Sequence, residues 1–321
     1  MNSMYKPEGS RINSLENREY LSTPQGMERA RLEGVILEGI VTLCDSRLCL
    51  HVDLPCAKGI IPPEEAVYCR EGEARKDIAL ITRVGKPVAF CITSIENHGG
   101  TWIAVLSRRQ AQRQCIRNYL SKLRVGDIIP ARVMHLEPFG AFLDVGCGVS
   151  SLLSVDCISV SRISHPRDRL RAGNELFVAI KTIDRESGRI YVTLRELLGT
   201  WEENAAAFEV GQTVTGVIRS VESYGVFVEL APNLAGLAEV RECDIEELRA
   251  HIGQCAAVYI KSIVPERMKI KLVMIDPSCG IPTMRSLRYY IDPAETAHLS
   301  HWVYSPKGAR KVVETRFEEF E

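Results

Sequence analysis

Apolar and polar residues alternate over short stretches through most of the chain, and glycines or charged turns separate these stretches. A period of two is typical of β-strands that bury one face. Between residues 124 and 197 the pattern predicts five short strands, enough for a small closed barrel but too few for a two-sheet sandwich. The alternating positions are Ile128, Val133, Leu136, Phe142, Val145, Val178, Ile180, Ile183, Ile190, Val192 and Leu194.

The barrel pattern occurs more than once along the chain. The segment 125–143 matches the segment 210–228 at a constant offset of 85 residues, and the segment 173–183 matches 253–263 at an offset of 80. The later copy is therefore five residues shorter in one loop. In the earlier copy this loop spans residues 154–172, and its Ser, Pro and Arg content is typical of a surface loop. A weaker copy precedes both, because strand-like alternation also runs through residues 34–107.

Helices are predicted between these copies. Residues 108–123 lack Gly and Pro and are rich in helix formers, and residues 200–208 begin with Thr200 and Glu203 in capping-box spacing. A helix is also expected from Thr23-Pro24 to about Glu33. The predicted organisation is an N-terminal arm and helix (1–33), a degenerate barrel (34–107), a basic linker helix (108–123), a barrel (124–197), a helical linker (198–208), a barrel (209–276) and a C-terminal tail (277–321).

Composition narrows the class of protein. Hydrophobic residues make up 45% and charged residues 25%, and the net charge is only −1, which is typical of a globular protein and not of one that coats nucleic acid indiscriminately. The start of the chain has no apolar run, so we expect no membrane partner and a cytoplasmic location. The 11 cysteines include no C-x-x-C pair, so no metal or other cofactor is expected.

Charge is nevertheless unevenly distributed. Residues 107–124 hold six basic side chains and no acidic one, whereas residues 209–276 hold seven basic and ten acidic side chains. A positive connector beside a mildly acidic module would give a directional field, although a solvated helix face is the commoner meaning of such a run. No nucleophile stands in a recognisable setting with an acid or base, so no catalytic residue and no enzymatic activity are predicted.

Two aromatic pairs recur at equivalent positions. Phe139 and Phe142 are three residues apart, and ideal alternation would place them on opposite faces of a strand. Gly140 changes this expectation, because a glycine can support a bulge or a close backbone approach that turns both rings outward. The alternative is that both rings fill the barrel. The pair Tyr224 and Phe227 at offset 85 favours the exposed arrangement, since a tyrosine hydroxyl suits a wet rim.

The order Val-Gly, Phe-Gly-Ala-Phe, Ile-Asp and Gly-Arg-Ile resembles the S1 RNA-binding domain. The resemblance is strong over about 150 residues and weak over 34–107, and it implies a mainly β protein of tandem five-stranded OB-fold barrels (S1 type) joined by short helices. It implies an RNA face at Phe139, Phe142, Asp184 and Arg189 in the second copy and at Tyr224, Phe227 and Lys269 in the third. In that family a histidine and an acid also belong to the RNA face. At the histidine position the second copy has Ser154 and the third has Glu239, and at the acid position the third copy has Val264.

Further basic residues are candidates for phosphate contact. They are Arg132, Lys181 and, in an arginine-rich loop that could equally be merely solvated, Arg167 and Arg169. The first copy has Arg47-Leu48-Cys49-Leu50 in place of the aromatic motif, so we predict a docking module there. In the tail, Trp302 and Tyr304 are expected to pack on the last barrel.

The predicted function is to hold single-stranded RNA, in particular messenger RNA, at the small ribosomal subunit, with no small-molecule substrate. The alternative is a docking module of a ribosome, polymerase or RNA-decay assembly.

Overall fold

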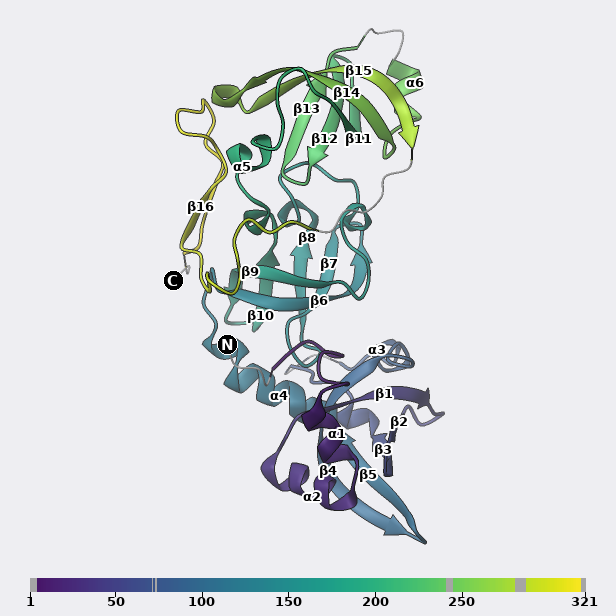
Figure 1. Ribbon diagram of the computed structural model, residues 1–321. Coiled ribbons are helices and arrows are strands. Elements are labelled where there is room, and N and C mark those ends of the chain that lie inside the picture. Colours follow the sequence, from purple (N-terminus) through teal and green to yellow (C-terminus); the bar gives the residue numbers. More distant parts are fainter. Residues whose placement is uncertain (1–4, 71, 73, 241–244, 281–286, 319–321) are drawn as a thin grey trace. The chain divides into compact units, whose positions relative to one another are not determined.

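The computed structural model describes residues 5–70, 72, 74–240, 245–280 and 287–318. Its strands form three closed five-stranded barrels with one shared topology (Figure 1). Within each barrel the strands neighbour one another in the order first, second, third, fifth, fourth, and the fourth closes on the first. The third and fifth strands run parallel, as in OB-folds. The predicted fold class, tandem OB-fold barrels joined by short helices, is confirmed.

The helices and strands have the following bounds. The N-terminal part contains α1 (Leu15–Leu21), α2 (Pro24–Glu33), β1 (Leu37–Cys44), β2 (Leu50–Leu54), β3 (Ala57–Ile61), α3 (Ile78–Ile81), β4 (Pro87–His98), β5 (Thr101–Ser107) and α4 (Arg108–Asn118). The second barrel contains β6 (Ile128–Glu137), β7 (Gly140–Asp144), β8 (Ser150–Ser154), β9 (Glu175–Asp184) and β10 (Arg189–Thr193). The remainder contains α5 (Trp201–Ala205), β11 (Thr213–Glu222), β12 (Gly225–Ala231), β13 (Leu234–Ala238), α6 (Ile245–Arg249), β14 (Cys255–Val264), β15 (Lys269–Gly280), β16 (His301–Val303) and β17 (Glu314–Arg316).

The chain divides into two compact units. The first unit comprises residues 1–123, 130–132 and 144–150, and the second comprises 124–129, 133–143 and 151–321. The boundary therefore runs through the second barrel, since short pieces of β6 and of the β7–β8 segment belong to the first unit.

The predicted helices are present and have the expected caps. The side chain of Thr23 accepts from Gly26 N at the start of α2, which ends at Gly34 with φ 66°, a conformation that favours glycine. Thr200 and Glu203 form the predicted capping box of α5. The linker helix α4 ends at Asn118, and a separate 3-10 turn follows.

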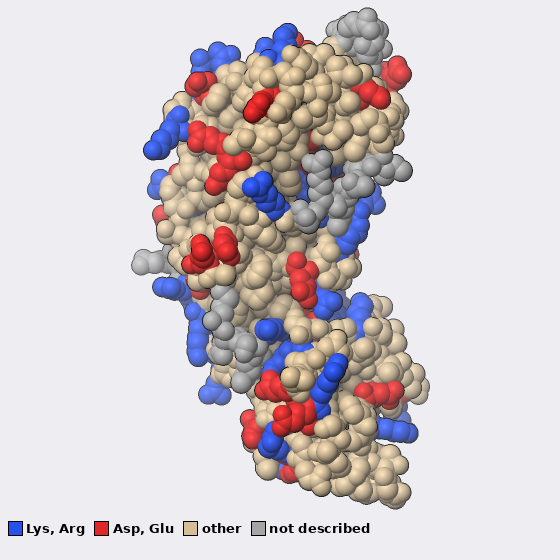
Figure 2. All heavy atoms as spheres, viewed as in Figure 1, with Lys and Arg blue, Asp and Glu red and all other residues tan. Residues whose placement is uncertain are grey.

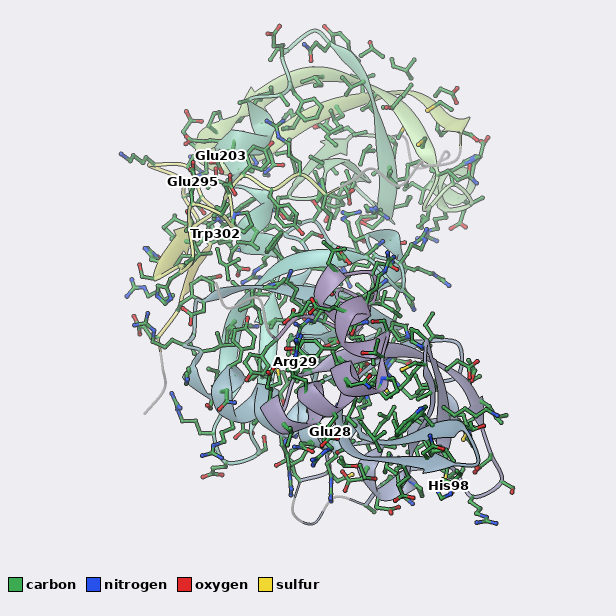
Figure 3. All side chains as sticks on the ribbon, turned by 60° about the horizontal axis from the view of Figure 1, so that its bottom comes forward. Glu28, Arg29, His98, Glu203, Glu295 and Trp302 are labelled. Atoms are coloured by element: carbon green, nitrogen blue, oxygen red, sulfur yellow. The ribbon has the colours of Figure 1, made fainter. Side chains whose placement is uncertain are left out.

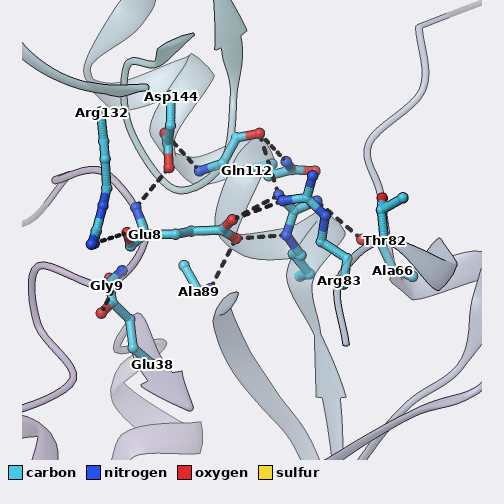
Figure 4. A network of polar contacts seen from close by, with 12 residues as sticks. Glu8, Gly9, Glu38, Ala66, Thr82, Arg83, Ala89, Gln112, Arg132 and Asp144 are labelled. Atoms are coloured by element: carbon cyan, nitrogen blue, oxygen red, sulfur yellow. Dashed lines mark hydrogen bonds and ion pairs between the residues drawn. The ribbon is translucent and has the colours of Figure 1, made fainter. Parts of the chain in front are cut away.

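A buried ion cluster holds the first unit together (Figure 4). Glu8 accepts hydrogen bonds from Arg108 at 2.6 Å and 3.0 Å, and its own backbone N donates to Asp144 Oδ2 at 2.7 Å. Burial and the nearby charge of Glu8 raise the pKa of Asp144. Burial also raises the pKa of Glu38 to about 7. In these two carboxyl groups the protonated form is therefore more stable than in an ordinary exposed carboxyl group.

The C-terminal segment folds back within the second unit. Trp302 (labelled in Figure 3) and Tyr304 are buried in one hydrophobic cluster with third-barrel residues such as Leu234. Tyr304 Oη donates to the carbonyl oxygen of Asn233 at 2.6 Å. The predicted packing on the last barrel is therefore confirmed for Tyr304, and Trp302 lies in the same cluster, which also contains second-barrel residues such as Ile128.

Among the described residues there is neither a helix able to cross a membrane nor a group of side chains able to hold a metal ion. None of the described helices has the length and apolarity needed to cross a bilayer. In the same residues, no three His, Cys, Asp or Glu side chains are grouped so that they could hold a metal ion.

Candidate nucleic-acid interface

The aromatic pair of the second barrel lies on its outer surface. Phe139 occupies the turn between β6 and β7, and Phe142 lies on β7. Their rings meet edge to face with centroids 6.0 Å apart and an interplanar angle of 87°. Phe139 is 56% exposed and Phe142 is half-buried. Because Phe139 precedes the strand, the alternation rule does not apply to it, and the two rings can share one surface.

Backbone contacts fix the turn that carries Phe139. The carbonyl oxygen of Phe139 accepts from Val155 N at 3.0 Å. At Gly140, an added Cβ would lie 2.5 Å from the carbonyl oxygen of Leu153, a distance that a real side chain does not tolerate. Of the two roles predicted for this glycine, the close backbone approach is the one that the structure shows.

The third barrel repeats the arrangement. Tyr224 lies in the turn before β12 and is 61% exposed, and its ring meets that of Phe227 with centroids 6.2 Å apart at 89°. A Cβ at Gly225 would lie 2.6 Å from the carbonyl oxygen of Ala238, so the glycine again permits a close approach. The register shift between β11 and β12 falls between Ile218 and Ser220, away from this turn. None of the four rings is sealed in a barrel interior.

A third ring joins the second barrel's pair, and sequence reasoning missed it. His135, exposed on β6, stacks on Phe142 with ring centroids 4.4 Å apart and an interplanar angle of 15°. At offset 85 these positions correspond to Ser220 and Phe227, which are register partners in the third barrel. The signal was present in the sequence, because two residues equally far from a hairpin turn face each other across it.

Strand register extends this pair into a row across the outer surface of each barrel. In the third barrel, successive partners form the row Ser220, Phe227, Leu237, Lys271 and Ser262. The equivalent row of the second barrel is His135, Phe142, Leu152, Tyr191 and Thr182, in which Leu152 pairs with Tyr191 and Tyr191 with Thr182. The second barrel therefore adds two rings, His135 and Tyr191, where the third has Ser220 and Lys271.

The acid and base expected beside this surface lie at one hairpin end. Asp184 and Arg189 are register partners at the end of the β9–β10 hairpin, and Val264 and Lys269 are their equivalents in the third barrel. The Asp184 carboxylate accepts from the Ser187 hydroxyl and from the backbone N of Ser187 at 3.0 Å. The hydrogen bond from Ser187 lowers the pKa of Asp184, so its negative charge is well stabilised.

The remaining basic candidates differ in their surroundings. Lys181 is exposed, and its Nζ lies 3.1 Å from Cys157 Sγ. Arg132 belongs to the first unit, where its Nη1 donates to the carbonyl oxygen of Glu8 at 3.0 Å. Arg167 is exposed at the surface of its loop.

Arg169 is the most buried of these candidates. It is only 6% exposed, and its guanidinium is paired with Glu229 of the third barrel. The loop therefore turns this side chain inward toward a buried acid and away from the outer surface that carries the aromatic rings.

The charge runs predicted from the sequence are partly neutralised. In the basic linker, Arg108 is buried against Glu8 and Arg109 pairs with Glu65. In the third barrel, Glu239 lies 3.7 Å from Lys271 Nζ. Basic and acidic side chains are interspersed over the face seen in Figure 2. Two of the six basic side chains of residues 107–124 are therefore paired with acids.

The first barrel lacks the aromatic surface. Leu48 lies in the β1–β2 turn with φ 64°, and Leu50 is buried at the start of β2. The row of partners equivalent to those above is Leu43, His51, Ile60, Val105 and Ser94. Its members are mostly aliphatic, and His51 Nε2 lies 3.0 Å from Asp45 Oδ2. Mostly aliphatic side chains therefore occupy the row that carries the aromatic rings in the other two barrels.

Comparisons with known proteins agree with the repeated barrels. The S1 RNA binding domain family matches residues 122–195. The small ribosomal subunit protein bS1 of Leuconostoc lactis is 32% identical over 180 residues, which cover 53% of this chain and 42% of that protein. The bS1 homolog of Bacillus subtilis (strain 168) is 30% identical over 174 residues, covering 53% and 44%.

A third relative, the bS1 protein of Chlamydia muridarum, is 25% identical over 232 residues, covering 70% of this chain and 38% of that protein. The chain thus spans less than half the length of these curated relatives. The match to 122–195 contains β6 to β10 and with them the surface formed by His135, Phe139, Phe142 and Tyr191. The second barrel therefore matches the S1 RNA binding domain family, and about half of the chain is similar in sequence to bS1 proteins.

Proposed function

We propose that this chain binds single-stranded RNA on the outer aromatic surface of the second barrel. The observation that carries the proposal is the cluster of Phe139, Phe142 and His135. The Phe139 ring is 56% exposed and meets Phe142, and Phe142 in turn stacks on His135 of the neighbouring strand. Bases stack on such rings with about 1–3 kcal/mol each, whatever their identity. Bases of a duplex are already stacked on one another, so the surface selects unpaired RNA.

Phosphate contacts complete the interface. Arg189 opens β10 at the exposed end of its hairpin, and Lys181 is exposed on β9. Such cations attract the RNA backbone without reading sequence, and they make the affinity fall as the salt concentration rises. Binding by this chain should therefore combine tolerance of sequence with marked salt dependence.

The third barrel supplies a second and weaker site. It retains Tyr224 and Phe227, but Ser220 and Lys271 replace the two extra rings of the second barrel. Glu239 further offsets the charge of Lys271 at 3.7 Å. A carboxylate beside the stacking rings repels phosphate, so we assign this barrel a supporting role.

The setting of the proposed activity is translation. The relatives are named as small ribosomal subunit proteins. We therefore infer that the chain holds messenger RNA at or near the small ribosomal subunit in the cytoplasm. Co-sedimentation with purified small subunits, with and without prior nuclease treatment, tests this: an association that survives nuclease is a protein contact, and one that is lost depends on RNA.

The first barrel favours a second role for part of the chain. Its equivalent row exposes Leu43 and half-exposes Ile60 and Val105, without a phenyl or indole ring. An aliphatic strip suits a protein surface better than a base. We propose that this barrel docks the chain on a protein partner.

Direct binding is the simplest test of the RNA proposal. A labelled, unstructured oligoribonucleotide should bind the full chain in fluorescence anisotropy, and the same strand annealed to its complement should bind at least about ten-fold more weakly. The slope of log affinity against log salt should be negative. Equal affinity for the two forms would refute the stacking surface.

A further inference from the structure

A cavity separate from the aromatic surface lies within the second unit. Its volume is about 560 Å³, inside the range of about 300–1,000 Å³ that is typical of small-molecule sites. Its walls come from the arginine-rich loop of the second barrel, from β11 and β12 of the third barrel, and from the C-terminal segment. Neither aromatic pair contributes to the lining.

The lining is strongly basic. Among the residues that the structure describes, it contains five arginines and two carboxylates, Asp168 and Glu229, and no other charged side chain, so these residues carry a formal charge of +3. The carboxylates are already engaged: Glu229 Oε2 accepts from Arg219 Nε at 2.8 Å and from Arg169, and Asp168 lies 3.5 Å from Arg219 Nη1. The charges of Arg167, Arg171 and Arg288 are therefore not balanced by the acids of the pocket.

One buried donor in this pocket has no partner. Arg169 is 6% exposed, and its Nε makes no hydrogen bond to any part of the chain that the structure describes. A buried charged donor without an acceptor is costly. Burial lowers the pKa of Arg169. An anion in the cavity would help to balance the charge of this buried guanidinium.

Two planar groups, a guanidinium and an aromatic ring, also line this cavity. The guanidinium of Arg288 lies over the ring of Tyr290, 4.7 Å from its centroid, and both residues line the pocket. Arginine and aromatic planes stack readily on nucleobases. Arginine forks also match the oxygen geometry of phosphate, which a lysine's single ammonium does not.

We infer that this pocket binds a nucleoside phosphate, with the phosphates on Arg169, Arg167 and Arg171 and the base against the Arg288–Tyr290 pair. The ligand is either a free nucleotide or the terminal nucleotide of an RNA strand, which share this chemistry. The site is independent of the aromatic surface, and it departs from the expectation from sequence, which was that the protein has no small-molecule substrate.

Calorimetric titration of the full chain tests the inference with ADP, GDP, inorganic pyrophosphate and adenosine as probes. We expect saturable one-to-one binding of at least one nucleotide, with at least about ten-fold weaker binding of pyrophosphate and of adenosine. Arg171→Ala and Arg288→Ala should each weaken nucleotide binding by about ten-fold. Arg162→Ala, an exposed arginine of the same loop outside the lining, is the matched control and should leave the affinity unchanged.

Two further comparisons separate the sources of the ligand and the two sites. In the Phe139→Ala/Phe142→Ala background, nucleotide binding should persist, which keeps failure of the RNA surface distinct from failure of this pocket. A 5′-phosphorylated oligoribonucleotide that displaces the nucleotide, when its 5′-hydroxyl form does not, identifies an RNA end as ligand; no displacement by either identifies a free nucleotide. Absence of saturable binding at 1 mM nucleotide, pyrophosphate binding as tight as nucleotide, or unchanged binding by Arg171→Ala and Arg288→Ala would each overturn the inference.

Discussion

His135 and Phe142 stack almost in parallel from adjacent strands of one hairpin, with ring centroids 4.4 Å apart. Ser220 occupies the histidine's place in the third barrel, so this stack distinguishes two otherwise repeated surfaces. A base that stacks on Phe139 would also lie beside Phe142, whose ring is already fixed in place by His135. This difference is why we propose the second barrel as the principal site for RNA.

Removing the histidine ring should weaken RNA binding. We expect His135→Ala to lower affinity for an unstructured RNA about three- to ten-fold in fluorescence anisotropy, because one stacking ring is lost and Phe142 is freed to move. His98→Ala, at the β4–β5 hairpin of the first barrel, is the matched control and should have no effect. Equal losses in the two variants would argue against a specific role for the stack.

Removing the charge of Glu239 in the third barrel should strengthen RNA binding. Glu239 repels phosphate and offsets Lys271, so Glu239→Gln should raise RNA affinity about two- to three-fold at low salt, with the gain shrinking as salt screens the charge. Glu247→Gln, an exposed glutamate of α6, serves as the control. A gain that persists in full at high salt would exclude this electrostatic explanation.

The folded-back C-terminal segment depends on a buried hydrogen bond. Tyr304→Phe removes the hydroxyl that donates to the Asn233 carbonyl at 2.6 Å, and it should lower the free energy of unfolding by about 1 kcal/mol in urea denaturation. Tyr259→Phe, an exposed tyrosine of β14, should change it by far less. Equal effects of the two substitutions would show that the hydrogen bond adds nothing to stability.

Stability of the first unit should depend on pH through Glu38. Burial raises the pKa of Glu38 to about 7, from an ordinary value of 4.5, so the folded state holds the proton more tightly than the unfolded chain. Its stabilising contribution is therefore complete below pH 4.5 and is lost as the pH rises through 7.

The variant Glu38→Gln tests this titration. Its amide oxygen can still accept from Gly9 N and Arg11 N, so the gain in unfolding free energy relative to the parent should be larger at pH 8 than at pH 5, by on the order of 2 kcal/mol. Thermal melts at the two pH values measure it. Glu64→Gln, at an exposed position, should leave the pH dependence as it was; a parallel shift of both variants would contradict the assignment.

The sequence predicted the barrels because their signals are local or repeated. Period-two alternation marks the strands, and the constant offsets mark the copies. Thr200 and Glu203 marked α5 through a cap that needs only three neighbouring residues. Phe139 and Tyr224 were predicted to be exposed for a different reason. The aromatic pair recurs at equivalent positions, and one member is a tyrosine, which is uncommon at a core position.

The misses depend on contacts between segments far apart in the chain. His135 and Tyr191 join the surface through strand register, which alternation within one strand does not reveal. The sequence places Arg169 in a surface loop, but its side chain is buried and paired with Glu229, sixty residues later in the chain. Nor does the sequence show that Arg288 reaches the same cavity from the tail, since the position of a folded-back segment follows from packing.

The central claim is that exposed rings on the second barrel hold unpaired bases, and the double substitution Phe139→Ala/Phe142→Ala tests it most directly. Anisotropy with an unstructured RNA should show a loss of affinity of about ten-fold or more, with the folded structure preserved in circular dichroism, and a smaller loss for Tyr224→Ala/Phe227→Ala. Unchanged affinity of a folded Phe139→Ala/Phe142→Ala protein would contradict the account.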